Sequence, residues 1–347
     1  MRRLIGLEVS SLLLLFLLVV GCGSDTATRD KPVMTTTMES TPTGMAPEGF
    51  DVQGHRGARG LKPENTLPAF EKALDLGVTT LELDLHMTAD GVVVVWHDPE
   101  IDKNKCGLDP DAAVEAPDPD SLIVQGAKLM ISNLTFEQLQ TYRCDRNPEP
   151  DNYPDQNSEP TVMAGDDYRI VSLSQLFDFV SAYSQSQHKS PEQRKNAEQV
   201  QFNIETKRRP DRPKIINDGF DGVNPGPFEL SILELVRERG LVDRVVVQSF
   251  DHRSLSAIRS VNNDIRLAAL TWPGGGLPQP AVLAKAGFNI WSPNLHQVSP
   301  DLLAEAHDAG MSVIPWTVND PDDMRRLIEM GVDGLISDRP DILVNLR

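Results

Sequence analysis

The sequence predicts an α/β fold, namely a TIM (β/α)8 barrel with one inserted lobe. Short apolar runs recur along the 347 residues, and most of them are followed by a helix-like pattern. Strands that alternate with helices pair in parallel through βαβ units, and eight such strands close a barrel. The eight predicted barrel strands are residues 51–55, 80–85, 201–205, 244–250, 266–271, 288–294, 312–317 and 334–338.

The first 48 residues are expected to lie outside the barrel, which we place at residues 49–347. Residues 1–22 have the features of an export signal, with an apolar stretch of about ten residues that is too short to span a bilayer. Their last letters, "LVVGC", are similar to the lipobox of bacterial lipoproteins, whose cysteine, here Cys22, is lipidated. An ordinary secretory signal is the alternative. Residues 23–48, rich in Thr, Met, Pro and Ser, predict a flexible tether.

The lipobox-like segment predicts an exported protein that a lipid anchors to a membrane, in the periplasm or at the cell surface. Gly23 follows the cysteine, which favours the outer membrane over the inner one. The formal net charge of −18 argues against a nucleic-acid partner, because binding to a phosphate backbone needs a basic face. The oligomeric state is not predicted.

The first helix of the barrel is expected within residues 64–77. Asn65 or Thr66 would cap its N-terminus, and Gly77 would end it. Residues 299–310 and 320–331 repeat this layout, and each segment ends in a glycine. The polar residues 183–200 are expected to form a surface loop.

A β-hairpin is predicted after the second strand, because only Asp90 and Gly91 separate two β-rich segments. Residues 92–96 then run antiparallel to the second strand and are not part of the barrel count. Asp84 and His97 lie nearly equally far from the turn, so they should face each other across it. The hairpin therefore returns His97 to the C-terminal rim of the barrel.

Residues from about 99 to 170 do not follow the strand–helix rhythm. They are rich in Pro and Asp, and a structureless loop of this length would be unusual in a compact domain. We expect an inserted lobe over the barrel mouth, between the hairpin and the next helix. Cys106 and Cys144 lie in this segment, and an exported protein favours a disulfide between them over two independent thiols.

Charged and titratable side chains follow several predicted strands at the C-terminal ends, where TIM barrels hold their active sites. Two histidines, three carboxylates and two cationic side chains should meet on that rim. They are His55, Arg56, Glu82, Asp84, His97, Glu205 and Lys207.

Three of these residues form a candidate metal site. Glu82 and Asp84 are two apart on a strand and point to the same side, and Glu205 would join them from the end of another strand on the same rim. Three carboxylates around one point repel each other unless a cation neutralises them, and oxygen ligands suit Ca²⁺ or Mg²⁺.

The remaining rim residues suggest acid–base chemistry on a phosphate. Imidazole titrates near neutral pH, so His55 and His97 are candidate proton carriers. Arg56 and Lys207 supply positive charge for a phosphate group. Glycines flank His55 and Arg56 in "GHRG", which would leave room for that phosphate to approach. Together these groups indicate phosphoester chemistry.

The chain also resembles a known family, the glycerophosphodiester phosphodiesterases, a TIM-barrel group related to the phosphatidylinositol phospholipases C. The matching segments run in order over nearly the whole barrel. They are "GHRG" (54–57), "PENT" (63–66), "LELDLHMTADGVVVVWHD" (81–98), "VSLSQLF" (171–177), "NIETK" (203–207), "VVQSF" (246–250), "WTVND" (316–320) and "GLISDRPD" (334–341).

The resemblance implies hydrolysis of a small-molecule glycerophosphodiester to glycerol 3-phosphate and an alcohol, with one divalent cation, Ca²⁺ or Mg²⁺. The resemblance also implies roles for individual residues. His55 and His97 would be the acid–base pair, Glu82, Asp84 and Glu205 the metal ligands, Arg56 and Lys207 the phosphate contacts, and Phe250 and Trp316 neighbours of the glycerol. The alternatives are a lysophospholipase D-like phosphodiesterase and an inactive lipoprotein that binds phosphodiesters.

Four further residues have open roles at this point. His86 stands where the resemblance leads us to expect a glutamine, and it could touch the substrate or make a local hydrogen bond. Glu64 and Asn65 could reach the rim or cap the first helix. Asp338 is expected to be structural and to tie down the end of the barrel.

Overall fold

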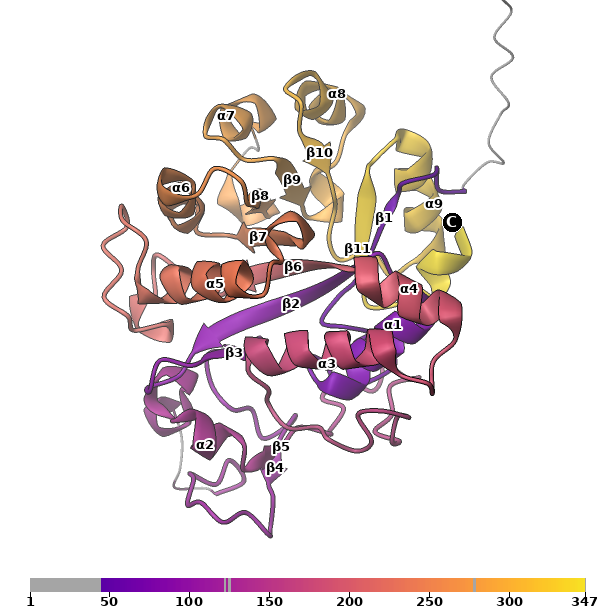
Figure 1. Ribbon diagram of the computed structural model, residues 1–347. Helices are drawn as coiled ribbons and strands as arrows, with labels where there is room; N and C mark the ends of the chain where they lie inside the picture. The colour runs from indigo at the N-terminus through magenta and orange to yellow at the C-terminus, as the bar shows by residue number, and fades with distance from the viewer. Residues whose placement is uncertain (1–44, 122, 124–125, 277–278, 347) are drawn as a thin grey trace, which may run out of the picture. The chain divides into compact units, whose positions relative to one another are not determined.

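The computed structural model describes residues 45–121, 123, 126–276 and 279–346, and it confirms the predicted barrel. Eight parallel strands surround the centre in Figure 1. They are β1 (Asp51–Gly54), β2 (Thr80–Met87), β6 (Gln201–Thr206), β7 (Val245–Ser249), β8 (Arg266–Thr271), β9 (Ile290–Pro293), β10 (Ser312–Val313) and β11 (Gly334–Ser337).

The strands follow one another around the barrel in the order β10-β9-β8-β7-β6-β2-β1-β11. Backbone hydrogen bonds bridge the remaining gap between β10 and β11. The Asp333 amide donates to the Val313 carbonyl at 3.0 Å, and the Ile336 amide donates to the Pro315 carbonyl at 3.0 Å. The C-terminal ends of all eight strands therefore meet at one rim.

Helices cover the outside of the strands (Figure 1). Thr66 occupies the N-cap position of the first of them, and Gly77, with a φ of 82°, ends it, as the sequence predicts. The helices around the barrel are α1 (Leu67–Leu76), α3 (Leu173–Gln185), α4 (Pro191–Gln199), α5 (Pro227–Glu238), α6 (His252–Val261), α7 (Pro280–Lys285), α8 (Pro300–Asp308), α9 (Pro321–Met330) and α10 (Pro340–Leu343).

The prediction of a surface loop at residues 183–200 is wrong. Part of this segment is α3, and another part is the separate helix α4. A capping box of Ser190 and Gln193 starts α4, with Pro191 at its first turn. The polar composition hid the helix because few apolar side chains mark its buried face.

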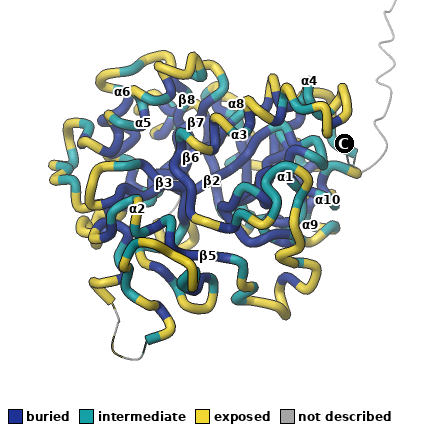
Figure 2. The backbone as a smooth tube through the Cα atoms, turned by 60° about the horizontal axis from the view of Figure 1, so that its bottom comes forward, coloured by how far each residue is buried: buried dark blue, intermediate teal, exposed yellow. Residues whose placement is uncertain are grey.

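Strand alternation places the functional side chains. Leu81, Leu83 and Leu85 of β2 are buried in the main hydrophobic core, which the helices cover. Glu82 and Asp84 alternate with them and point into the barrel. In Figure 2, the strands of the barrel run as buried segments through the middle of the domain. The carboxylates of β2 are thus as buried as the leucines beside them.

The predicted hairpin is present. β3 (Val93–Val95) pairs antiparallel with β2, and His86 lies opposite Val94. The register differs by one residue from the expectation, because the Trp96 amide, not His97, lies against the Asp84 carbonyl, at 2.9 Å. His97 is the next residue after Trp96, so it lies at the rim, just beyond the paired part of the hairpin.

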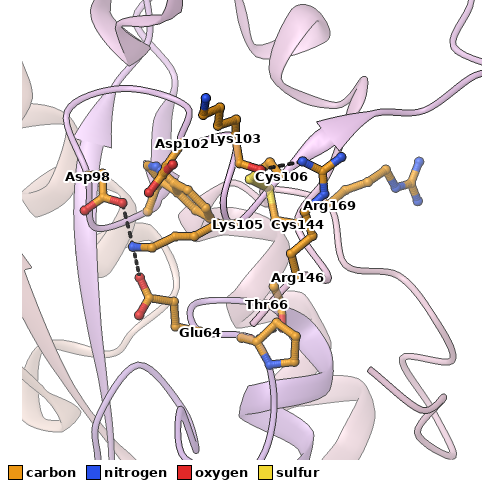
Figure 3. The surroundings of a disulfide bond; sticks show 12 residues. Glu64, Thr66, Asp98, Asp102, Lys103, Lys105, Cys106, Cys144, Arg146 and Arg169 are labelled. Atoms are coloured by element: carbon orange, nitrogen blue, oxygen red, sulfur yellow. Dashed lines mark hydrogen bonds and ion pairs between the residues drawn. A yellow bond between two sulfur atoms is a disulfide. The ribbon is translucent and has the colours of Figure 1, made fainter. Parts of the chain in front are cut away.

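The inserted segment forms a lobe with its own small core. It contains α2 (Phe136–Leu139) and the two-stranded sheet of β4 (Gly107–Leu108) and β5 (Tyr142–Arg143). A disulfide joins Cys106 and Cys144, next to these two strands (Figure 3). The buried residues of the lobe's core, which includes two residues of the hairpin, are Val94, Trp96, Ile101, Cys106, Leu129, Ile131, Leu134, Leu139, Tyr142, Cys144 and Ile170.

The N-terminal predictions fall almost entirely outside the described residues. The proposed export signal, Cys22 and the tether up to residue 44 are not described, whereas Ala46 already packs against the barrel core. Within the described ranges, no helix has the length and apolarity needed to cross a membrane.

Candidate active site

The turn after β1 explains why His55 and Arg56 lie between glycines. Arg56 has a φ of 52° and Gly57 a φ of 85°. A Cβ on Gly54 would lie 2.2 Å from the Gly57 carbonyl oxygen, and one on Gly57 would lie 2.6 Å from the carbonyl carbon of Ala69. The tight turn packs on α1 and needs glycine at both positions. It lifts His55 and Arg56 onto the rim.

His55 is held by a buried carboxylate. Its Nδ1 lies 2.6 Å from Asp338 Oδ1, and its Nε2 lies 3.8 Å from Glu82 Oε2. Burial lowers the pKa of His55 below its usual value, against the pull of Asp338. The Asp338 carboxylate at Nδ1 leaves Nε2 as the atom that faces the other carboxylates.

Asp338 does more than the structural role expected of it. Besides His55, it accepts two hydrogen bonds from Arg59 and one each from Tyr153 and Asn319. Burial alone would raise the pKa of Asp338, but His55 and Arg59 hold it well below the usual range. Asp338 therefore ties down the barrel end and also orients His55.

The three predicted metal ligands come together. Oxygen atoms of Glu82, Asp84 and Glu205 all lie within 4.8 Å of one another, and the three residues are buried. Burial and the neighbouring carboxylates raise the pKa of Glu82 well above normal, and burial raises that of Glu205 to about 7. The protein by itself therefore does not neutralise this cluster fully.

A cation fits this cluster. Asp84 Oδ1 is buried and has no hydrogen-bond partner among the described residues, so it offers a free ligand atom. All the available donors are carboxylate oxygens, which hard divalent cations prefer. Lys207 lies alongside, with Nζ 2.9 Å from Glu205 Oε1 and 3.4 Å from Asp84 Oδ1.

Amide side chains inside the barrel hold Glu82 in place. Gln248 Nε2 donates to Glu82 Oε1 at 2.7 Å, and Asn203 donates to both Gln248 and Gln53. The Arg56 backbone amide donates to the second oxygen, Glu82 Oε2, at 2.9 Å. Both oxygens of the Glu82 carboxylate are therefore held by donors from the protein. Sequence reasoning missed the role of Gln248, because its partner Glu82 lies 166 positions away.

Arg56 is fixed by two acidic partners. Nη1 donates to Glu64 Oε2 at 2.8 Å, and Nε lies 3.1 Å from Asp84 Oδ2. Asn65 donates to the same Asp84 oxygen at 2.8 Å. The open question about Glu64 and Asn65 is thereby settled, since both side chains reach the rim and Thr66 takes the N-cap position.

His97 has the same arrangement as His55. Its Nδ1 lies 2.7 Å from Asp98 Oδ1, so the neighbouring residue supplies its carboxylate. Its side chain is 29% exposed. Burial, together with Arg56 and Lys207, lowers the pKa of His97 to about 4. His86 makes a local hydrogen bond with the His97 carbonyl through Nε2, at 3.0 Å, and so supports the backbone there.

A cavity of about 820 Å³ opens next to these groups. His97, Glu205 and Lys207 line one part, and Phe250 lines another. Phe250 packs edge-on against Trp316, with ring centroids 5.3 Å apart, and also against Trp272, at 5.1 Å. The structure thus places the two predicted aromatic residues together and adds Trp272, which sequence reasoning missed.

The arrangement defines a class of protein. It is a TIM barrel whose rim carries a cation-ready carboxylate cluster, two carboxylate-paired histidines, and an arginine and a lysine, which suits acid–base chemistry on a phosphoester.

The chain belongs to the glycerophosphoryl diester phosphodiesterase family, whose model matches residues 55–342. A protein named glycerophosphodiester phosphodiesterase from Caldanaerobacter subterraneus subsp. tengcongensis is 25% identical over 85% of this chain and 96% of its own length.

Two solved structures show the same fold. One, from Silicibacter pomeroyi and provisionally named a glycerophosphoryl diester phosphodiesterase, is 28% identical, with a TM-score of 0.68 over 88% of this chain and 95% of that one. The other is an Oleispira antarctica phosphodiesterase in complex with the product sn-glycerol-3-phosphate. It is 16% identical, with a TM-score of 0.61 over 87% of this chain and 96% of that one.

Proposed function

We propose that this protein hydrolyses glycerophosphodiesters to glycerol 3-phosphate and an alcohol, with a divalent cation and two histidines. The observation that carries the proposal is the convergence of His55, His97, Arg56, Lys207 and a buried carboxylate trio at one end of the barrel. The family supports the substrate class, and its relatives carry the same activity in their names.

The two histidines divide the proton transfers. One takes a proton from the nucleophile, which is the neighbouring glycerol hydroxyl, so that a cyclic phosphate forms and the alcohol leaves. The other gives a proton to the departing oxygen. Water then opens the cyclic phosphate to glycerol 3-phosphate, and the two histidines transfer the protons in the reverse sense. Each imidazole is oriented by a carboxylate at Nδ1, Asp338 for His55 and Asp98 for His97, and so can exchange a proton at Nε2.

Positive charge stabilises the phosphoryl oxygens while the bonds change. Arg56 and Lys207 remain charged, since the pKa of each is raised by neighbouring carboxylates although burial alone would lower it. They are therefore preorganised donors for a phosphate. Glu82, Asp84 and Glu205 would hold the cation, which when bound supplies Lewis-acid stabilisation of the phosphoryl charge.

The direct test is an assay of glycerol 3-phosphate release from glycerophosphocholine, with and without EDTA. We expect activity that EDTA abolishes and that Ca²⁺ or Mg²⁺ restores. Glu205→Gln should shift the cation titration to higher concentrations, and an unchanged titration would remove Glu205 from the metal site. Tight diester binding without release of alcohol at saturating cation would instead identify an inactive binding protein.

A second substrate class is favoured by the apolar wall of the cavity. The apolar residues that line the cavity are Ile215, Leu270, Leu283 and the exposed Trp272 and Val282. Such a wall suits an acyl chain, which a lysophospholipid has and glycerophosphocholine lacks. Assaying both substrates side by side separates the two classes, and turnover of the lysophospholipid alone would make the protein lysophospholipase D-like.

A further inference from the structure

A lysine from the inserted lobe reaches the catalytic rim. Lys105 Nζ donates to Asp98 Oδ2 at 2.5 Å and to Glu64 Oε1 at 2.7 Å. Its side chain is only 13% exposed. Figure 3 shows it extending between the two carboxylates, away from the disulfide. Burial alone would lower the pKa of Lys105, but Glu64 and Asp98 raise it, so the ammonium stays charged.

Each of those carboxylates uses its other oxygen on a residue of the active site. Asp98 Oδ1 lies 2.7 Å from His97 Nδ1, and Glu64 Oε2 accepts from Arg56 Nη1 at 2.8 Å. Lys105 therefore joins the support of a proton-carrying histidine to the support of a phosphate-binding arginine. Without this ammonium, Asp98 would keep the imidazole as its remaining side-chain partner in the described structure, and its carboxylate could rotate toward water.

The backbone of Lys105 is fixed by the lobe. The next residue, Cys106, is bonded to Cys144, and the amides of both Lys105 and Cys106 donate to the Asp102 carbonyl at 2.9 and 2.8 Å. The Lys105 carbonyl accepts from the Arg146 amide at 3.1 Å. Because the backbone of Lys105 is fixed, its side chain starts from one position near the rim. Less conformational entropy is therefore lost when the ammonium binds Asp98 and Glu64.

The contacts of Lys105 also explain a second group of acidic residues near the rim. Atoms of Glu64, His97 and Asp98 lie within 4.8 Å of one another, a spacing that could hold a metal ion. Here the ammonium of Lys105 bonds to both carboxylates, and together with the Arg56 guanidinium on Glu64 it balances their two charges. The cluster is therefore a support for His97, held by the charge of the protein itself.

We propose that Lys105 is a positioning residue for His97. It locks Asp98, Asp98 holds the imidazole with Nε2 available for proton transfer, and the Cys106–Cys144 disulfide holds Lys105 in reach. This inference rests on the proposed two-histidine catalysis. It also gives the inserted lobe a part in the reaction, because the Cys106–Cys144 disulfide of the lobe helps to fix the orientation of His97.

The test is the substitution Lys105→Met in the full, oxidised chain, with kcat and KM measured on glycerophosphocholine. We expect kcat to fall about tenfold, because small misplacements of a catalytic group cost one to two orders of magnitude. KM should change far less, because Arg56 keeps its hydrogen bond to Glu64 and its ion pair with Asp84. Lys103→Met is the matched control, since Lys103 is exposed and Figure 3 draws no contact between its amine and Asp98 or Glu64. It should leave both constants unchanged.

Two further measurements separate positioning from a general loss of stability. The double variant Lys105→Met with Asp98→Asn should be no slower than Asp98→Asn alone, because both residues act through one imidazole. Reduction with dithiothreitol should lower kcat of the parent protein and of Lys103→Met but leave that of Lys105→Met unchanged. If Lys105→Met does not fold, Lys105→Gln removes the charge and keeps one donor group for the same measurements.

Normal kcat in folded Lys105→Met, or losses that multiply independently in the double variant, would overturn the inference. Equal sensitivity of Lys105→Met and the parent to reduction would also overturn it. If His97→Ala retains turnover, the proposed two-histidine mechanism fails, and the inference fails with it. Loss of turnover in His97→Ala together with full turnover in Lys105→Met would reject the inference alone.

Discussion

At the scale of single residues, the site works through pairs of an acid and a base. Both histidines carry a carboxylate at Nδ1, although one carboxylate lies 283 positions away and the other is the next residue. Replacing either imidazole removes a proton carrier, so His55→Ala and His97→Ala should each lower kcat by about 10²–10⁴-fold. Circular dichroism should show an intact fold, and near-normal turnover in either variant would discredit the acid–base assignment.

The raised pKa of Glu205, about 7, predicts how pH affects the metal-free protein. A carboxyl group whose pKa is raised by folding stabilises the folded state at low pH, and this contribution is lost as pH rises from about 4.5 to about 7. In EDTA, the unfolding temperature of the parent protein should therefore fall, relative to that of Glu205→Gln, between pH 5 and pH 7.5. Histidines that titrate in the same range are common to both proteins and cancel in the comparison. Parallel curves would contradict the raised pKa.

At the scale of elements, the turn between β1 and α1 leaves no room for a side chain at Gly57. Gly57→Ala would place a methyl group 2.6 Å from the backbone of α1, at a φ of 85°. Gly77→Ala is a matched control, because Gly77 has a φ of 82° and no atom within 4 Å of an added Cβ. We expect Gly77→Ala to cost about 1 kcal/mol of unfolding free energy and Gly57→Ala clearly more. Urea unfolding measures both, and equal losses would show that the close packing is unimportant.

At the scale of the whole molecule, the barrel is a scaffold that brings distant segments to one rim. A separate prediction concerns whether a lipid attaches the domain to a membrane. If Cys22 is lipidated, the protein should fractionate with membranes and incorporate labelled palmitate when expressed in bacteria, whereas Cys22→Ala should do neither. Phosphodiesterase activity per molecule should be equal in the two, because Cys22 precedes the first barrel strand in the sequence. Labelling of Cys22→Ala would place the lipid elsewhere.

Much of this architecture could be predicted because it follows local rules. Alternation along β2 determines that Glu82 and Asp84 share a face, and the Asp90–Gly91 turn determines the hairpin. Helix α4 escaped prediction because its sequence is almost entirely polar, and its stability depends on capping and on Lys189, which pairs with Glu71 and Asp75 on α1. Such pairs over long separations leave no periodic signal.

The sequence by itself determined the barrel, the hairpin and the identity of the charged residues at the strand ends, because strand periodicity and parallel connection are local properties. The tertiary structure alone decided which partner each of these residues has. Asp338 meets His55, Gln248 meets Glu82, and Lys105 meets Glu64 only after the barrel closes and the lobe folds against it. Side-chain pairing depends on distances between segments far apart in the chain, and those distances exist only in the folded state.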